Sequence, residues 1–127
     1  MAVTYALATP MTYLAGANVN TTYTGAAYVL EFGLQAESII NTESGYNWSD
    51  WYTANAATYP DVERLLVHAA GCLGAMQIIN ADMSGFVNIQ EAVARINTLF
   101  EMYKRDIELL KQQKMKDFVR VCGGVYP

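Results

Sequence analysis

Residues 88–113 read NIQEAVARINTLFEMYKRDIELLKQQ, and this stretch decides the fold class. Its apolar side chains recur at steps of four, three, four, four and three residues, the spacing of one face of an α-helix; they are Ala92, Ile96, Leu99, Tyr103, Ile107 and Leu110. Asn88 and Glu91 have the spacing of a helix-capping pair, which places the helix start at Asn88. At 1.5 Å per residue, the sequence therefore predicts one amphipathic helix about 39 Å long.

Two further helices are predicted before this one. The better defined runs from about Pro60 to Asp82, because its proline and acidic side chains suit a first turn and its apolar residues keep helical spacing. Small residues give it a face that allows another helix to approach closely: Ala69, Ala70, Gly71, Gly74 and Ala75. The other helix runs over about residues 25–42. Gly33 inside it costs roughly 1 kcal/mol relative to alanine, so we expect close packing against another backbone there.

The remaining segments are predicted to be extended or irregular. Residues 1–24 carry no charge, and Pro10, Gly16 and Asn18 interrupt any helical period, so we predict an extended arm or a pair of short strands. An uncharged arm rich in β-forming residues would aggregate in water, so we expect it to pack against its own domain or against another chain. Residues 43–59 are predicted to be a loop with room for a short helical turn after Asn47 or Ser49.

The predicted fold class is mainly α. A small bundle of three principal helices occupies residues 25–113, between an uncharged extended arm (1–24) and a C-terminal arm (114–127). The C-terminal arm is open to two interpretations, a short β element or a frayed helical turn. At 127 residues the chain is long enough for one domain with a single core.

Composition and charge indicate a protein that works with neighbours. Hydrophobic residues make up 53% of the chain and charged residues 16%, whereas a typical soluble domain has about 25% charged residues. The chain therefore has more apolar surface than a small monomer buries. No Lys or Arg precedes Arg64, and six of the eight basic residues lie between 104 and 120. This asymmetry fits either a solvated helix end or acidic-to-basic contacts between subunits.

No catalytic, cofactor-binding or metal-binding residue is predicted. His68 is the only histidine, and with Cys72 one turn later it offers too few ligands for a metal site, so a packing role is favoured. The same pair lacks an oxyanion hole and an orienting third group for nucleophilic catalysis. No glycine-rich phosphate loop is present. Cys72 and Cys122 form no spaced motif, which favours a reducing compartment. We therefore expect a protein without enzymatic activity.

An aromatic cluster is the remaining candidate site in the first half of the chain, comprising Trp48, Trp51, Tyr52 and Tyr59. Tryptophan and tyrosine serve equally as core residues and as interface anchors. Core packing is favoured for Trp48 and is left open for Trp51. Trp51 and Tyr52 are the candidate interface residues of this segment.

Three features together resemble the small head–tail connector proteins (adaptor or head-completion proteins) of tailed bacteriophages. They are AESIIN at 36–41 followed by GYNW at 45–48, the apolar helix of 62–80 that runs into DMSGF at 82–86, and the long helix of 88–113 with a basic tail containing Phe118. The resemblance covers roughly residues 30–120. The uncharged arm of residues 1–24 departs from it.

The resemblance implies a structural virion subunit. Copies would form a ring, commonly of twelve, beneath the portal protein at the neck of the virion, after assembly in the host cytoplasm and without any membrane. The ring would contact a tail or stopper (nozzle) protein and continue the DNA channel without binding DNA specifically. The C-terminal segment would reach into the portal, so the candidate interface residues there are Lys111, Lys114, Lys116, Phe118 and Arg120.

Two other functions stay open. The chain could be a non-enzymatic helical module that recruits a partner through the aromatic loop 46–59, in which case alanine at Trp51 and Tyr52 would abolish binding. It could instead be a DNA-binding packaging component. That function predicts a salt-dependent affinity for DNA carried by Lys111, Lys114 and Lys116.

Overall fold

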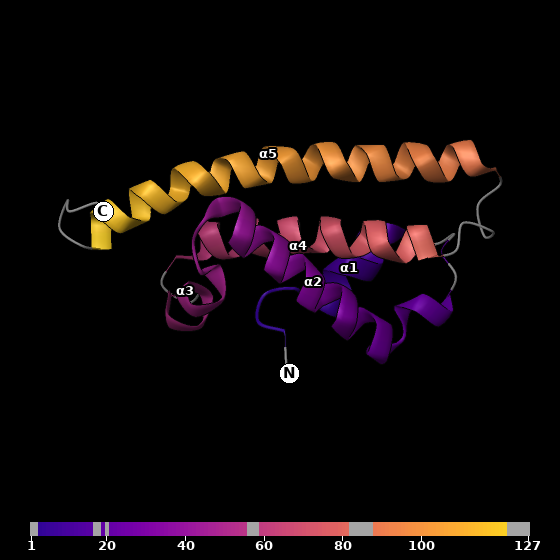
Figure 1. The fold of residues 1–127 in the computed structure, drawn as a ribbon, viewed down its shortest axis with the longest axis horizontal. Coiled ribbons are helices and arrows are strands. Elements are labelled where there is room, and N and C mark those ends of the chain that lie inside the picture. The colour runs from indigo at the N-terminus through magenta and orange to yellow at the C-terminus, as the bar shows by residue number, and fades with distance from the viewer. Residues whose placement is uncertain (1–2, 17–18, 20, 56–58, 82–87, 122–127) are drawn as a thin grey trace.

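The computed structural model describes residues 3–16, 19, 21–55, 59–81 and 88–121, with the backbone alone at 21–22, 55 and 113–121 (Figure 1). In chain order the elements are α1 (Ala8–Ala15), the 3-10 turn η1 (Thr21–Thr24), α2 (Ala26–Ser44), α3 (Trp48–Asn55), α4 (Pro60–Ala81) and α5 (Ile89–Val121). No strand occurs in these ranges. The predicted class, a small and mainly α bundle, is confirmed.

Helix α4 is the centre of the bundle, because α1, α2 and α5 all pack on it (Figure 1). Its middle turns, residues 69–75, are buried all round, whereas Met76 and Gln77 after them are half-buried and Asn80 is exposed. In length and composition α4 could cross a membrane, with a mean hydropathy of 1.3 over its most apolar window. That window is 61% buried inside the chain. The core position of α4 is enough to account for its apolar composition.

Helix α5 runs alongside α4 and begins where the sequence predicts. The Asn88 side chain accepts a hydrogen bond from the Glu91 backbone N–H at 2.8 Å, which is the predicted cap. The predicted apolar row faces inward, with Ala92, Leu99, Tyr103, Ile107 and Leu110 buried and Ile96 half-buried.

The end of α5 differs from the prediction. The helix continues to Val121 instead of ending at Gln113. Residues 114–121 contain no Gly or Pro and include several good helix formers, so nothing local stops the helix. The possible β element over this stretch is therefore corrected to helix. The final residues of the predicted C-terminal arm, 122–127, lie outside the described part of the chain.

The N-terminal segment requires the largest correction. Residues 8–15 form helix α1 where an extended arm was predicted. Pro10 lies in the first turn of α1, where a missing N–H removes no helical hydrogen bond. Gly16, with φ of 91°, follows the last turn. Pro10 therefore lies at the start of the helix and Gly16 at its end, and neither residue interrupts it. Met11 and Ala15 are buried, so the segment receives its cover from its own domain.

The small-residue face of α4 is where α1 packs. A Cβ at Gly74 would overlap the side chain of Met11, and a Cβ at Gly71 would lie 3.0 Å from the Cδ1 atom of Leu14. In α2, a Cβ at Gly33 would lie 2.8 Å from the Cγ1 atom of Val3. The close approaches predicted at these glycines are confirmed, and the N-terminal segment makes all three.

A buried carboxylate fixes the start of the chain to α2. Glu37 is 6% exposed, and its Oε2 atom accepts backbone N–H hydrogen bonds from Thr4 at 2.6 Å, Tyr5 at 2.8 Å and Ala6 at 2.9 Å. Charge-assisted hydrogen bonds of this kind are among the stronger ones in proteins. The Tyr5 hydroxyl donates to Asn41 Oδ1 at 2.9 Å on the same helix. Residues 4–6 are therefore held firmly against α2.

Candidate functional site

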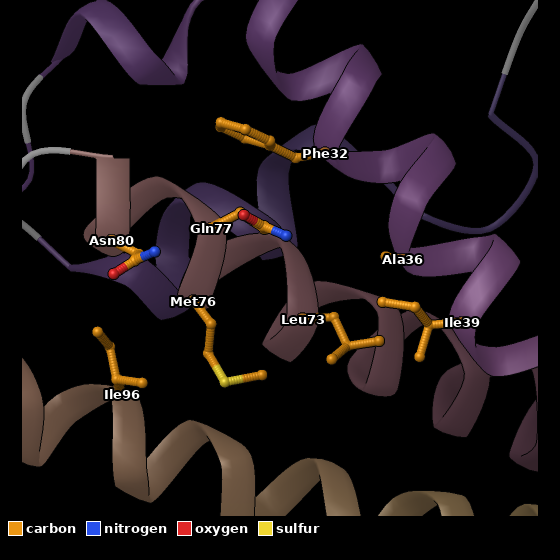
Figure 2. A pocket seen from close by; sticks show the side chains of 8 residues that line it. All are labelled: Phe32, Ala36, Ile39, Leu73, Met76, Gln77, Asn80 and Ile96. Atoms are coloured by element: carbon orange, nitrogen blue, oxygen red, sulfur yellow. The ribbon is translucent and has the colours of Figure 1, made fainter. Parts of the chain in front are cut away.

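Helices α2 and α5 lie on α4 and diverge from each other. Figure 1 shows the C-terminal end of α2 close to α5 and its N-terminal end far from it. An open groove of about 330 Å³ lies between them. Figure 2 shows its lining, which is Phe32, Ala36 and Ile39 from α2, Leu73, Met76, Gln77 and Asn80 from α4, and Ile96 from α5. None of these side chains is charged.

The narrow end of the groove is closed by a hydrogen bond between α2 and α5. The Tyr103 hydroxyl donates to the Glu43 carboxylate, and the Phe100 ring stacks on Tyr103 with centroids 6.4 Å apart. Burial of the hydroxyl, followed by its hydrogen bond to Glu43 and the charge of Glu43, raises the pKa of Tyr103 above its ordinary value. Tyr103 is therefore neutral and able to donate across the physiological range.

Exposed apolar surface on α5 borders the groove and reaches the narrow end at Phe100. On α5, Ile89, Val93, Ile96 and Phe100 follow one another at steps of four, three and four residues, so they share one face. We call these four residues the α5 stripe. Ile89 is 68% exposed, Val93 41% and Phe100 46%. Across the groove, Ile39 of α2 is 42% exposed. Few soluble monomers leave such contiguous apolar surface in water.

Charge differs between the two sides of the groove. The α2 side exposes Glu31 and Glu43 and has no basic residue, because the first in the chain is Arg64. The α5 side exposes Lys104, Arg105 and Lys111. Lys104 lies 3.7 Å from Glu101 and 5.5 Å from the Phe100 ring centroid, both on its own helix. The molecule therefore has an acidic side and a mixed, partly basic side.

The aromatic candidates lie mainly inside the fold. Trp51 is 6% exposed and packs edge-on against the fully buried Trp48, with centroids 5.4 Å apart. Trp51, whose role the sequence leaves open, is accordingly packed in the core of this chain. The short helical turn predicted after Asn47 is helix α3, which is eight residues long. Trp51 lies on the side of α3 that packs into the fold. Tyr52 is half-buried, and its hydroxyl donates to Glu63 Oε1 at 3.3 Å.

The C-terminal candidates, four of them basic and one a phenylalanine, are all on α5. Lys111 is exposed. The others, Lys114, Lys116, Phe118 and Arg120, lie on the last turns of the helix, where side chains are outside the described part of the chain. The structure brings none of the described basic candidates together with Tyr52 or Trp51 into one site.

A second cluster joins α4 to α5, and sequence reasoning found only part of it. His68 Nδ1 is hydrogen-bonded to Asp106 Oδ2, and Cys72 Sγ lies 3.9 Å from each ring nitrogen. Asp106 is 2% exposed and Cys72 is fully buried. Burial, and secondarily the charge of Asp106, raises the pKa of Cys72 to about 12. Asp106 is separated from His68 by 38 residues, so no local pattern could have revealed it.

The cluster contains the residue types of a nucleophile, a base and an orienting carboxylate, but not their geometry. In such a triad the carboxylate holds one imidazole nitrogen and the nucleophile hydrogen-bonds to the other. Here the sulfur is equally far from both nitrogens, so it lies beside the ring and not in line with Nε2. The side-chain ligand atoms of His68, Cys72 and Asp106 all lie within 4.8 Å of one another, a spacing that could serve a metal ion.

No protein-family model, curated protein or solved structure matches this chain.

Proposed function

We propose that this chain is a structural subunit that assembles with copies of itself through the α2–α5 groove and the α5 stripe. The observation that carries the proposal is the exposed apolar stripe beside an open apolar groove. Burying this surface in a neighbouring subunit would contribute about 25 cal/mol for each Å² of apolar area removed from water. The hydrophobic composition of the chain, 53%, supports the same use.

The distribution of charge favours a second copy as the occupant of the groove. The acidic α2 side, with Glu31 and Glu43, complements the exposed Lys104, Arg105 and Lys111 of α5 in another subunit. Two different surfaces then meet, so the contact is heterologous. A heterologous contact builds a ring when its rotation closes, and an open filament when it does not.

The resemblance to phage head–tail connectors gives this assembly a specific role. On that basis the chain forms a ring beneath the portal protein, meets a tail or stopper protein on the other side, and surrounds the DNA channel. Two features support the proposal: a helical bundle that leaves apolar surface for neighbours, and a long C-terminal helix whose final third is rich in Lys and Arg. The ring and its place at the virion neck belong to the proposal.

Electron microscopy of the purified full-length chain tests this function. We expect closed rings of uniform size with a central channel wide enough for duplex DNA. Open filaments would retain self-assembly and contradict the connector role. Monomers alone, at concentrations where rings are expected, would contradict both.

Recruitment of a partner through residues 46–59 has less support. Trp48 and Trp51 are buried, which leaves little apolar surface on this segment for a partner. Alanine at Trp51 would therefore remove core packing, and its effect on binding would follow from unfolding. Tyr52→Phe is the cleaner variant, because it removes only the hydroxyl that contacts Glu63. Under our proposal it leaves assembly intact.

A further inference from the structure

We propose that His68, Cys72 and Asp106 form a binding site for a divalent transition metal ion, with zinc as the best match. The three side chains come from two helices, α4 and α5, and converge at the buried interface between them. Because the ion would bind residues on both helices, it would join α4 to α5 at this point. This site is separate from the α2–α5 groove, whose lining includes none of the three residues.

The ligand atoms lie within 4.8 Å of one another, and side-chain movements would bring them to the spacing of a tetrahedral ion. With typical zinc–nitrogen, zinc–oxygen and zinc–sulfur bonds, neighbouring ligand atoms in a tetrahedral site are about 3.3–3.6 Å apart. Cys72 Sγ lies 3.9 Å from His68 Nδ1, close to that value. His68 Nδ1 and Asp106 Oδ2 are in direct hydrogen-bond contact, so the ion would replace the shared proton and separate the two atoms.

The charges also balance. One thiolate, one carboxylate and one neutral imidazole carry two negative charges, which a divalent ion neutralises. Arg105 is a further charge beside the cluster, with its Nε atom 3.8 Å from Asp106 Oδ1, but its side chain is 67% exposed and water screens its charge. Neutrality matters because Asp106 is 2% exposed and Cys72 is fully buried, and unpaired charge at such positions is costly. On binding, the S–H bond of Cys72 breaks, a sulfur–metal bond forms and the thiol proton leaves to solvent. The proton shared by His68 Nδ1 and Asp106 is also lost from Nδ1, and the imidazole stays neutral by taking a proton on Nε2, so one proton is released in total. No redox change takes place.

The ligand types select the class of metal. Thiolate and imidazole ligands suit zinc and cobalt, whereas magnesium and calcium prefer oxygen ligands alone. Three protein ligands leave one tetrahedral position for water or another group. His68 is 35% exposed, and it borders a cavity of about 250 Å³ between α1 and α4. Solvent and ions can therefore approach the cluster from the His68 side.

The test is a cobalt titration of the full-length chain without an affinity tag. Cobalt(II) bound to a thiolate gives a near-ultraviolet charge-transfer band, and tetrahedral coordination gives strong visible bands. The Cys122→Ser variant is the essential protein for this experiment, because Cys72 is then its only thiol. We expect the charge-transfer band to saturate at one cobalt per chain and to disappear when one equivalent of zinc is added.

Two further variants locate the other ligands. Asp106→Asn and His68→Gln keep side-chain volume and should weaken cobalt binding by about tenfold or more. Glu108→Gln, an exposed carboxylate on the same helix, is the matched control and should leave binding unchanged. If the ligand variants do not fold, the titration of Cys122→Ser still decides the question. Absence of the thiolate band in Cys122→Ser, or equal binding by Asp106→Asn and Glu108→Gln, would overturn the proposal.

Discussion

The rest of the chain covers the two faces of helix α4 to different extents. On one face, α1 lies so close that a Cβ at Gly74 would overlap Met11. On the other, α2 and α5 diverge and leave a groove of about 330 Å³ lined mainly by apolar side chains, with Gln77 and Asn80 as the polar ones. The first face is completed within the chain, by a segment that contributes the buried Tyr5 and Met11. The second is not completed by any described part of the chain.

The difference between these faces indicates where stability and function reside. A change on the α1 face alters packing that the monomer itself needs, so it should lower the free energy of unfolding. A change on the groove face alters surface that is already exposed to water, so it should affect assembly and leave the monomer stable. Measurements of stability and of assembly on matched variants therefore distinguish the two faces.

The largest effect is expected from Glu37→Leu. The substitution removes the acceptor of the backbone N–H groups of Thr4, Tyr5 and Ala6 and detaches the segment that carries α1. Unsatisfied buried donors cost about 1–3 kcal/mol each, so we expect a loss of about 3 kcal/mol or more in the free energy of unfolding. Urea denaturation measures it. Glu31→Leu, the same change at an exposed position of α2, should stay within about 0.5 kcal/mol of the unmodified chain.

A matched pair of glycine substitutions tests the contact between α1 and α4. Gly74→Ala and Gly71→Ala each gain about 1 kcal/mol in helix propensity. At Gly74 the new methyl group would overlap Met11, and overpacking costs typically 1–3 kcal/mol, so a net loss of about 1 kcal/mol is expected. At Gly71 the nearest atom is the flexible end of Leu14, and stability should be unchanged or higher. Equal thermal midpoints for the two variants would contradict this packing.

Tyr103→Phe tests the closed end of the groove. It removes the hydrogen bond to Glu43 while preserving the ring, and we expect a loss of about 1 kcal/mol. If the hydrogen bond holds α2 against α5, hydrogen exchange should increase in the last turns of α2. Unchanged exchange there would show that packing alone closes this end.

The raised pKa of Tyr103 leads to a prediction for the stability of the chain at alkaline pH. The pKa of Tyr103 is raised in the folded chain, so the unfolded chain releases this proton first as pH increases. The stability that Tyr103 contributes is complete below about pH 10, the ordinary tyrosine pKa, and is lost as pH rises above it. Tyr103→Phe should therefore lose stability less steeply above pH 10 than the unmodified chain. Denaturation curves at pH 8, 10 and 11 would show parallel losses if the account is wrong.

The smallest effect on the monomer is expected from Val93→Lys. Val93 is 41% exposed in the α5 stripe, so a lysine there reaches water and should change the free energy of unfolding by less than about 0.5 kcal/mol. Leu109→Lys is the matched control, because Leu109 is 43% exposed on α5 but outside the stripe. Circular dichroism melts of the two variants should agree at protein concentrations low enough to keep both monomeric, because assembly would itself raise the melting temperature of Leu109→Lys.

The sequence predicts much of this fold and little of its two sites. Periodicity identifies α4 and α5, because each helix keeps an apolar face over many turns. The glycines of α4 correctly predict that another element packs closely on this helix, but they do not indicate which element it is. Helix α1 is missed since Pro10 reads as a helix breaker, although a first turn tolerates it. Asp106 meets His68 only through the packing of α4 on α5, and the groove exists only because α2 and α5 diverge.

The central claim, that the groove face is an assembly surface, is tested most directly by sedimentation velocity of the full-length chain over a range of concentrations. We predict a single large species for the unmodified chain and for Leu109→Lys. For Val93→Lys, with the same folded stability, we predict a shift to the monomer. A compact monomer for the unmodified chain at the highest concentration, or an unchanged large species for Val93→Lys, would contradict the claim.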